Sequence, residues 1–271
     1  MSVSYAEMVG RNAGFLFPDE QERLRDAAVF VCGVGGMGGV AAQTLVRAGL
    51  GTLAIADPDT FEVSNLNRQP FAYTDTLGCP KADVTRSALL RINPDLRVRV
   101  VGDWEARLAE VLPSHPVVIN AMDDARAGVA LYRAAREHEA TVVDAYTSPC
   151  PSVFVVRPSD PRPEERLGYP TAGVPLAEIT EAMLRGAFLS EVAYVAAASQ
   201  GIARLDPAIV SEIVQGLRPR ISFAPMVTIA GSLMAFEAIA CVLGRPSAAD
   251  AAGYFFDPWS GRVERPEERA S

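Results

Sequence analysis

The fold is decided by the stretch Val31-Cys32-Gly33-Val34-Gly35-Gly36-Met37-Gly38-Gly39. It ends the apolar run 28–32 and leads into residues 36–48, where apolar residues recur at helical spacing. Glycines let the backbone turn tightly, and the N-terminus of a helix offers free N–H groups and a positive dipole end to phosphate oxygens. The stretch therefore predicts a strand, a phosphate-binding loop and a helix, in which the nucleotide contacts Gly33, Gly35, Gly36 and Gly38.

Short apolar runs alternate with helical patterns through the first 157 residues. We expect strands at 28–32, 52–56, 97–101, 116–121, 141–145 and 152–156. We expect helices at 1–27, 36–48, 81–92, 105–112 and 124–139. Strands that alternate with helices at this spacing form βαβ units, so the sequence predicts an α/β fold with a doubly wound, mostly parallel, Rossmann-like sheet.

The pattern changes after residue 157. A proline-rich, charged segment at 157–169 predicts a loop, and a short strand is expected at 254–256. Helices are expected at 176–187, 191–203, 207–217 and 225–244. We expect one domain over 1–271, with a nucleotide-binding part at 1–157 and a helical part at 158–271 that binds substrate and forms a dimer interface.

Composition limits the partners and metals. The net charge is −8 without a long basic run, which argues against nucleic acid as the main partner. The four cysteines form no C-x-x-C pair and there are only two histidines, so we expect no zinc site. The N-terminus lacks an apolar leader, and the apolar segment 225–244 contains Glu237, which disfavours a membrane span. We therefore expect a cytoplasmic protein with no membrane partner.

A second informative stretch, Ser64-Asn65-Leu66-Asn67-Arg68-Gln69, lies in the long polar loop 58–77. Loops of this length in compact domains are usually functional. A simple nicotinamide-binding protein needs only an acid in this region, whereas a cation indicates chemistry on a triphosphate. The loop therefore favours a nucleotide-consuming reaction.

Several motifs follow one another in a set order: Gly33–Gly38, Ala56-Asp57-Pro58-Asp59, Ser64–Gln69, Gly78-Cys79-Pro80-Lys81-Ala82, Ile92-Asn93-Pro94, Met122-Asp123-Asp124, Pro225-Met226-Val227 and Gly231–Ile239. This ordered set resembles the ThiF-type adenylyltransferases, which activate ubiquitin-like and sulfur-carrier proteins. The resemblance covers about residues 9–157 and 220–245. It implies ATP-dependent adenylation of a carboxylate, which is a protein or peptide C-terminus or a small metabolite.

The residues suit that chemistry. Attack of a carboxylate on the α-phosphorus brings anions together, and Arg68 and Lys81 supply the cations that offset this repulsion. Asp123 follows a strand and carries oxygen ligands for Mg²⁺, and the resemblance implies that it is important for adenylation. We therefore expect Arg68, Lys81 and Asp123 to be catalytic, with ATP and Mg²⁺ as cofactors.

The remaining candidates bind the nucleotide. Asp57 ends the second strand, where a carboxylate accepts hydrogen bonds from ribose hydroxyls. The same ATP site is expected to include Asp59, Asn65 and Gln69. The resemblance also implies that Arg11 matches an N-terminal arginine that, in related dimers, reaches the ATP of the other subunit.

The chain departs from the family at its cysteines. Many members carry two C-x-x-C zinc pairs and a cysteine nucleophile after the sheet, but residues 151–240 here contain no cysteine. We therefore expect the acyl group to pass to an external nucleophile such as sulfide, an amine or an internal amide. Cys79, beside Lys81, and Cys150 stay as alternative thioester sites.

Two other functions stay open at this stage. A glycine-rich loop also suits a nicotinamide-dependent oxidoreductase, although no His or Tyr–Lys arrangement is evident for hydride chemistry. A nucleotide-binding scaffold without activity is the other alternative, and retention of Arg68, Lys81 and Asp123 argues against it. The apolar helix 225–244 has more apolar surface than an isolated helix leaves exposed, which is consistent with a buried position or a dimer contact, and we expect a homodimer.

Overall fold

A computed structural model gives the structure of residues 4–266. Eight strands form one sheet in the order β3-β2-β1-β4-β5-β6-β7-β8. The strands are β1 (Ala28–Cys32), β2 (Thr52–Ala56), β3 (Arg97–Val100), β4 (Val117–Asn120), β5 (Thr141–Asp144), β6 (Ser152–Val156), β7 (Tyr254–Asp257) and β8 (Arg262–Glu264). The first five strands are parallel, and β6, β7 and β8 extend the sheet with antiparallel pairing. The predicted α/β fold with a mostly parallel sheet is confirmed.

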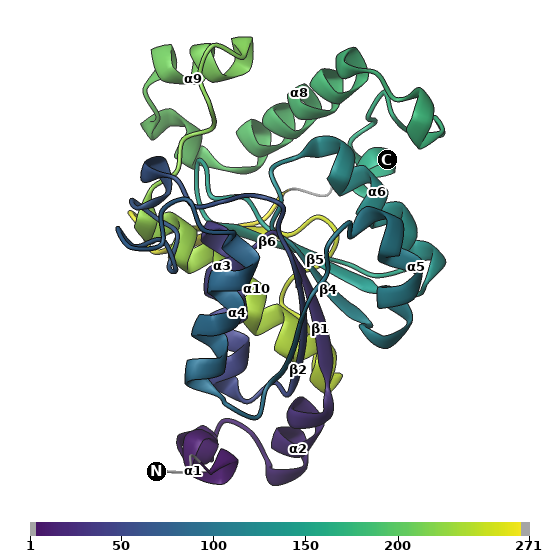
Figure 1. The fold of residues 1–271 in the computed structure, drawn as a ribbon. Helices are drawn as coiled ribbons and strands as arrows, with labels where there is room; N and C mark the ends of the chain where they lie inside the picture. The colour runs from purple at the N-terminus through teal and green to yellow at the C-terminus, as the bar shows by residue number, and fades with distance from the viewer. Residues whose placement is uncertain (1–3, 267–271) are drawn as a thin grey trace.

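Helices cover both faces of the sheet (Figure 1). They are α1 (Tyr5–Val9), α2 (Pro18–Asp26), α3 (Gly36–Ala48), α4 (Lys81–Ile92), α5 (Leu108–Val111), α6 (Ala125–Glu137), α7 (Pro163–Arg166), α8 (Glu181–Ala198), α9 (Pro207–Gln215) and α10 (Ala224–Leu243). Short 3-10 turns include η1 (Gly10–Asn12), η2 (Val63–Asn65), η5 (Leu176–Glu178) and η6 (Gln200–Arg204). Because strand side chains alternate, Val29 and Val31 pack in the core on the α3 side, while Phe30 packs in the core beside Leu131 of α6.

The N-terminal segment is not the single helix that its sequence predicts. It divides into α1, η1 and α2, and α2 begins afresh at Pro18, a residue that suits the first position of a helix. Asn12 fixes the intervening turn, because its side-chain amide donates 2.9 Å to the Ala48 carbonyl at the end of α3.

The helices α8 and α9 lie over the carboxyl ends of the strands and form a cap (Figure 1). Two separate helices were expected at 176–187 and 191–203, and this prediction is wrong: α8 runs unbroken over Glu181–Ala198. Its start is set by Thr180, whose hydroxyl accepts from the Met183 N–H at 3.3 Å. Residues 176–179 are held outside the helix because Arg126 donates to the carbonyls of Leu176 and Ile179.

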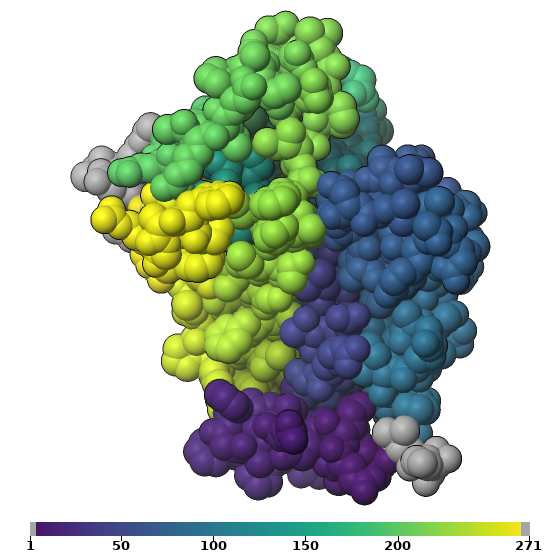
Figure 2. Space-filling model, turned by 90° about the vertical axis from the view of Figure 1, so that its left-hand side faces the viewer, coloured from purple at the N-terminus to yellow at the C-terminus, as the bar shows by residue number. Residues whose placement is uncertain are grey.

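The helix α10 joins the C-terminal half to the first βα unit. Its length and mean hydropathy of 2.0 would suffice for a membrane span, and 56% of its most apolar window is buried. It packs along α3 and across β4, β5 and β6. Gly231 permits this close approach, since a Cβ there would lie 2.6 Å from the Met37 carbonyl oxygen. Figure 2 shows α10 beside α3 on one face of the molecule.

Candidate active site

The glycine loop lies at the carboxyl end of β1. Gly33 adopts a left-handed conformation at φ 84°, and its N–H donates 2.7 Å to the Ala56 carbonyl of β2. A Cβ at Gly33 would lie 2.7 Å from the Ala121 oxygen, and one at Gly38 would lie 1.8 Å from the Gly33 oxygen. The loop therefore needs glycine at both positions. It directs the unpaired N–H groups of the first turn of α3 away from the sheet, where they can bind phosphate oxygens.

The end of β2 fixes this loop. The Asp57 carboxylate accepts from the Val34 N–H at 2.8 Å and from the Asp59 N–H at 3.0 Å. Partial burial raises the pKa of Asp57 from its ordinary value. Asp59 in turn accepts from the Lys81 ammonium at 2.9 Å, and Lys81 is buried at the first position of α4. These contacts link three predicted site residues, Asp57, Asp59 and Lys81, to the glycine loop.

The loop between β2 and α4 brings Arg68 and Gln69 to the start of α3. A Cβ at Gly36 would lie 3.8 Å from the Arg68 Cγ, and one at Gly35 would lie 3.3 Å from the Gln69 Nε2. One guanidinium nitrogen of Arg68 donates 2.9 Å to the Ser64 carbonyl and to Asn67 Oδ1, which fixes its direction. The Gln69 Oε1 is buried and accepts no hydrogen bond from the described residues. A buried acceptor beside a phosphate-binding loop suits a hydrogen-bonding ligand such as a nucleotide.

Asn65 has a structural part in the same loop. Its side-chain oxygen accepts from the Glu62 N–H at 3.0 Å, which closes the turn η2. The side chain is buried. The Asn65 carbonyl also accepts from the Arg68 N–H at 3.1 Å, so Asn65 supports the loop that carries Arg68.

Asp123 lies just beyond β4, on the other side of the glycine loop. Its side chain is exposed, while the neighbouring Asp124 caps α6 by accepting from the Ala127 N–H at 2.8 Å. Among residues 4–266 no group of three metal-ligating side chains is present. Mg²⁺ usually takes one or two carboxylates together with substrate phosphates, so an exposed carboxylate at this edge fits that mode of binding.

Two partly buried carboxylates at this edge were missed by sequence reasoning. Asp144, at the end of β5, accepts from Asn120 Nδ2 and from the Tyr132 hydroxyl, each at 2.8 Å. Burial raises the pKa of Asp144. Because Asn120 ends β4, this pair holds the strand end that leads into Asp123. The sequence signal that could have identified Asp144 is the one used for Asp57, which is a polar residue at the end of an apolar strand.

The second missed carboxylate is Glu191 of α8. It accepts from the Tyr169 hydroxyl at 2.9 Å and lies 3.6 Å from the Arg220 guanidinium. Burial raises the pKa of Glu191 as well. The pair with Arg220 ties the cap to the segment that precedes α10, so the cap is fixed over the sheet edge.

Arg11 is the predicted site residue that the structure does not bring to the others. It lies exposed in η1, beside the C-terminal end of α3. The glycine loop meets the opposite end of α3, and a helix of 13 residues spans about 20 Å. Arg11 therefore does not reach the glycine loop of its own chain.

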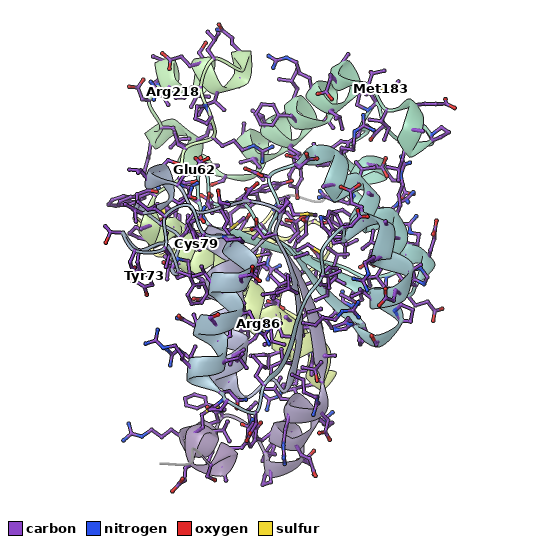
Figure 3. The ribbon with its side chains drawn as sticks, in the orientation of Figure 1. Glu62, Tyr73, Cys79, Arg86, Met183 and Arg218 are labelled. Atoms are coloured by element: carbon purple, nitrogen blue, oxygen red, sulfur yellow. The ribbon has the colours of Figure 1, made fainter. Side chains whose placement is uncertain are left out.

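The cysteines do not form a reactive group with the site. Burial raises the pKa of the Cys32 and Cys150 thiols, which disfavours the thiolate. Cys79 is half-buried in the loop above α4, on the side of the molecule that carries Glu62 and Tyr73 (Figure 3). Among the described residues, no side-chain hydrogen bond or ion pair joins Cys79 to Lys81.

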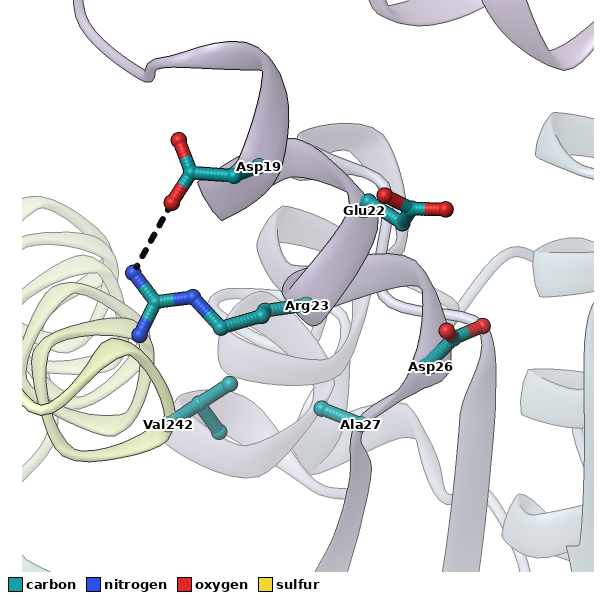
Figure 4. A pocket seen from close by; sticks show the side chains of 6 residues that line it. All are labelled: Asp19, Glu22, Arg23, Asp26, Ala27 and Val242. Atoms are coloured by element: carbon teal, nitrogen blue, oxygen red, sulfur yellow. Dashed lines mark ion pairs between the residues drawn. The ribbon is translucent and has the colours of Figure 1, made fainter.

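A pocket at the other end of the molecule is lined by side chains that do not suit nucleotide binding. It lies between α2 and the end of α10, and three carboxylates, Asp19, Glu22 and Asp26, line it (Figure 4). Arg23 is paired with Asp19 at 3.7 Å. Phosphate oxygens would be repelled there, so the carboxyl edge of the sheet is the candidate active site.

Comparison with known proteins identifies the family of the chain. The family model of the ThiF family matches residues 9–271. The chain belongs to the ThiF family. The predicted family is thereby confirmed, and the glycine loop, Arg68, Lys81 and Asp123 lie within the matched region.

Curated relatives of this ThiF-family chain match over part of their length. The molybdopterin-synthase adenylyltransferase of Escherichia coli is 41% identical over 113 residues, which are 41% of this chain and 45% of the relative. The tRNA threonylcarbamoyladenosine dehydratase of E. coli is 36% identical over 146 residues, which are 53% and 54% of the two chains. The matches thus span about half the length of these curated relatives.

Solved structures show the same fold over most of the chain. PaaA aligns with a TM-score of 0.68 and 20% identity, over 98% of this chain and 84% of its own. E. coli MccB, solved with ATP, aligns with a TM-score of 0.66 and 16% identity, over 91% and 65%. At these identities the likeness shows the fold alone.

Proposed function

We propose that this protein catalyses the ATP-dependent adenylation of a carboxylate. One observation carries the proposal: three charged residues stand on segments that pack on, or are linked by hydrogen bonds to, the glycine loop at the carboxyl edge of the sheet. Arg68 lies at Gly36, Lys81 connects through Asp59 to the loop, and Asp123 follows the strand end that packs on Gly33. The names of curated relatives, among them the sulfur carrier protein adenylyltransferase of Thermus thermophilus, support the same reaction.

In the proposed reaction an oxygen of the substrate carboxylate attacks the α-phosphorus of ATP. The bond from that phosphorus to the bridging oxygen of the β-phosphate breaks, and pyrophosphate leaves with the electron pair. Arg68 and Lys81 offset the charge that builds on the phosphates, because fixed cations in a partly dry site stabilise such charge strongly. Asp123 would hold Mg²⁺, which supplies further positive charge on the phosphates.

We propose that the acyl group then passes directly from AMP to an external nucleophile. Burial of Cys32 and Cys150, and the absence of a cysteine from residues 151–240, support this route. The nucleophile is sulfide, an amine or an internal amide, and the substrate carboxylate belongs to a protein, a peptide or a small metabolite.

We propose further that two copies of the chain form a homodimer. The outer side of α10 carries Phe236, which is 68% exposed and follows the exposed Thr228 and Ser232 on the same helix. A second copy packed on this face would cover it. In such a dimer Arg11 acts in trans, because it lies far from the glycine loop of its own chain. Light scattering of the protein and of Phe236→Asp tests this assembly.

Exchange of labelled pyrophosphate into ATP tests the proposed function. An adenylating enzyme exchanges pyrophosphate in the presence of its carboxylate substrate. A nicotinamide-dependent oxidoreductase and a scaffold without activity do not. Calorimetry with Mg·ATP and with NAD adds a binding measurement, and tighter binding of NAD would contradict the proposal.

A further inference from the structure

A pocket beside the proposed nucleotide site has no part in the reaction described above. It has a volume of about 240 Å³ and lies between the loop after β5, the turn η6, the start of α10 and the turn between β7 and β8. These segments come together on the face shown in Figure 2, where the cap meets α10 and the last strands. The pocket thus opens under the cap, at the carboxyl side of β5.

The pocket shares a wall with the glycine loop. Met226 lines the pocket, and the next residue, Val227, packs so closely on the loop that a Cβ at Gly36 would lie 2.7 Å from its Cγ1. On the same wall the Ser222 carbonyl accepts from Asn67 Nδ2 at 3.1 Å, and Asn67 adjoins Arg68. The start of α10 and the loop that carries Arg68 therefore connect this pocket to the proposed phosphate site.

The lining offers apolar surface and no unpaired charge. Leu205, Ile221, Phe223, Met226 and Trp259 supply most of it. Among the described residues that line it, the one that is charged, Arg204, is paired with Asp257 at 2.5 Å. An ionic group in the pocket would lose its hydration without gaining a counter-charge, whereas an apolar group would gain from burial.

The volume of the pocket and its aromatic lining limit which chemical group it can hold. Pockets that hold whole drug-sized ligands measure about 300–1,000 Å³, so this smaller pocket suits a single side chain. Two aromatic rings flank it and are exposed to solvent, Trp259 at 68% and Phe223 at 56%. Aromatic rings pack favourably against a third ring in edge-to-face or offset geometry, beyond the gain from buried area alone.

We propose that this pocket binds an aromatic side chain of the carboxylate substrate, close to the reacting carboxylate. The proposal rests on the proposed adenylation and narrows its substrate class. A chain that ends in two glycines presents no such group, so the substrate is a peptide or small acid with an aromatic ring. The pocket then contributes specificity, because a substrate without the ring leaves the pocket empty and binds less tightly.

Tryptophan fluorescence measures binding in the pocket and does not require catalytic activity. The chain has two tryptophans, and Trp104 is buried, so a Trp104→Phe background leaves Trp259 as the reporter. Addition of 3-phenylpropionate should shift the Trp259 emission to shorter wavelength and saturate. Phe223→Ala should weaken binding about fivefold, the effect of losing one aromatic partner. Leu217→Ala is the matched control, because Leu217 is exposed on the same segment but does not line the pocket.

Pyrophosphate exchange with two probes tests the substrate class. N-acetylglycylphenylalanine should support faster exchange than N-acetylglycylglycine, and Ile221→Trp, which fills the pocket, should remove the difference. Equal exchange with both peptides, or no change in Trp259 emission with millimolar 3-phenylpropionate, would contradict the proposal that the pocket binds an aromatic side chain. Neither result would contradict the proposed adenylation. Binding of the ring without exchange from either peptide would support the pocket and count against adenylation of peptides.

Discussion

The Asp57 carboxylate accepts a hydrogen bond of 2.8 Å from the Val34 N–H, so the end of the second strand fixes the glycine loop at the end of the first. Asp57→Ala should therefore weaken the binding of Mg·ATP by roughly tenfold or more, because a charge-assisted hydrogen bond that orders the loop is lost. Calorimetric titration measures the change. Asp75→Ala, an exposed position in the following loop, is the control and should bind normally. An unchanged Kd for Asp57→Ala would show that the loop holds its shape alone.

Arg68→Ala and Asp123→Ala should each lower the rate of pyrophosphate exchange by roughly a hundredfold, the usual effect of removing one preorganised charge from a reacting group. Asp123 is exposed and Arg68 is half-buried in a loop, so melting temperatures should stay close to that of the parent. Exchange assays and thermal melts of the same preparations check both outcomes. Near-normal exchange in either variant would remove that residue from the mechanism.

A variant without cysteine should keep its activity. Cys79 is only half-buried, and Cys79→Ser should leave product formation within about twofold, as expected of a surface substitution away from the reaction. Cys32→Ala and Cys150→Ala should lower stability, because both side chains are fully buried. Loss of product in Cys79→Ser, with exchange intact, would instead point to a thioester at Cys79.

Catalysis should depend on a metal ion, whereas folding should not. A strong chelator should stop pyrophosphate exchange, and added Mg²⁺ should restore it, because the phosphates need a hard cation. The melting temperature should not change on chelation, since residues 4–266 hold no group of three metal-ligating side chains. Stoichiometric zinc in the purified protein, or a large fall in melting temperature, would contradict this prediction.

The Arg204–Asp257 pair makes stability depend on pH in a defined window. The Arg204 guanidinium and the Ser260 hydroxyl lower the pKa of Asp257 to about 2 from its ordinary 3.8. A lowered pKa in the folded state means that the stabilisation is present above about pH 4 and is lost as the pH falls through about 2. Denaturant unfolding should therefore show Asp257→Asn less stable than the parent at pH 7, with the difference shrinking below pH 4. A difference that is constant with pH would exclude the ion pair as its cause.

The sequence was most informative where local chemistry decides the structure. Glycines mark both ends of α3, and its predicted bounds of 36–48 are those observed. By contrast, the contact between Asn120 and Asp144 depends on the pairing of β4 with β5, which no local pattern encodes. The unbroken α8 and the partial burial of Glu191 depend in the same way on how the cap packs over the sheet. Sequence reasoning therefore found the charges on loops near the phosphates but missed those buried by packing.

The close contact of Gly231 with α3 has a consequence for the order in which the chain becomes competent. Val227 and Gly231 belong to α10, far along the sequence from the glycine loop, yet they pack against Gly36 and Met37. During synthesis the glycine loop is made early but lacks this support until α10 has left the ribosome. A chain that ends before residue 224 thus has the nucleotide motif without the wall against which it packs.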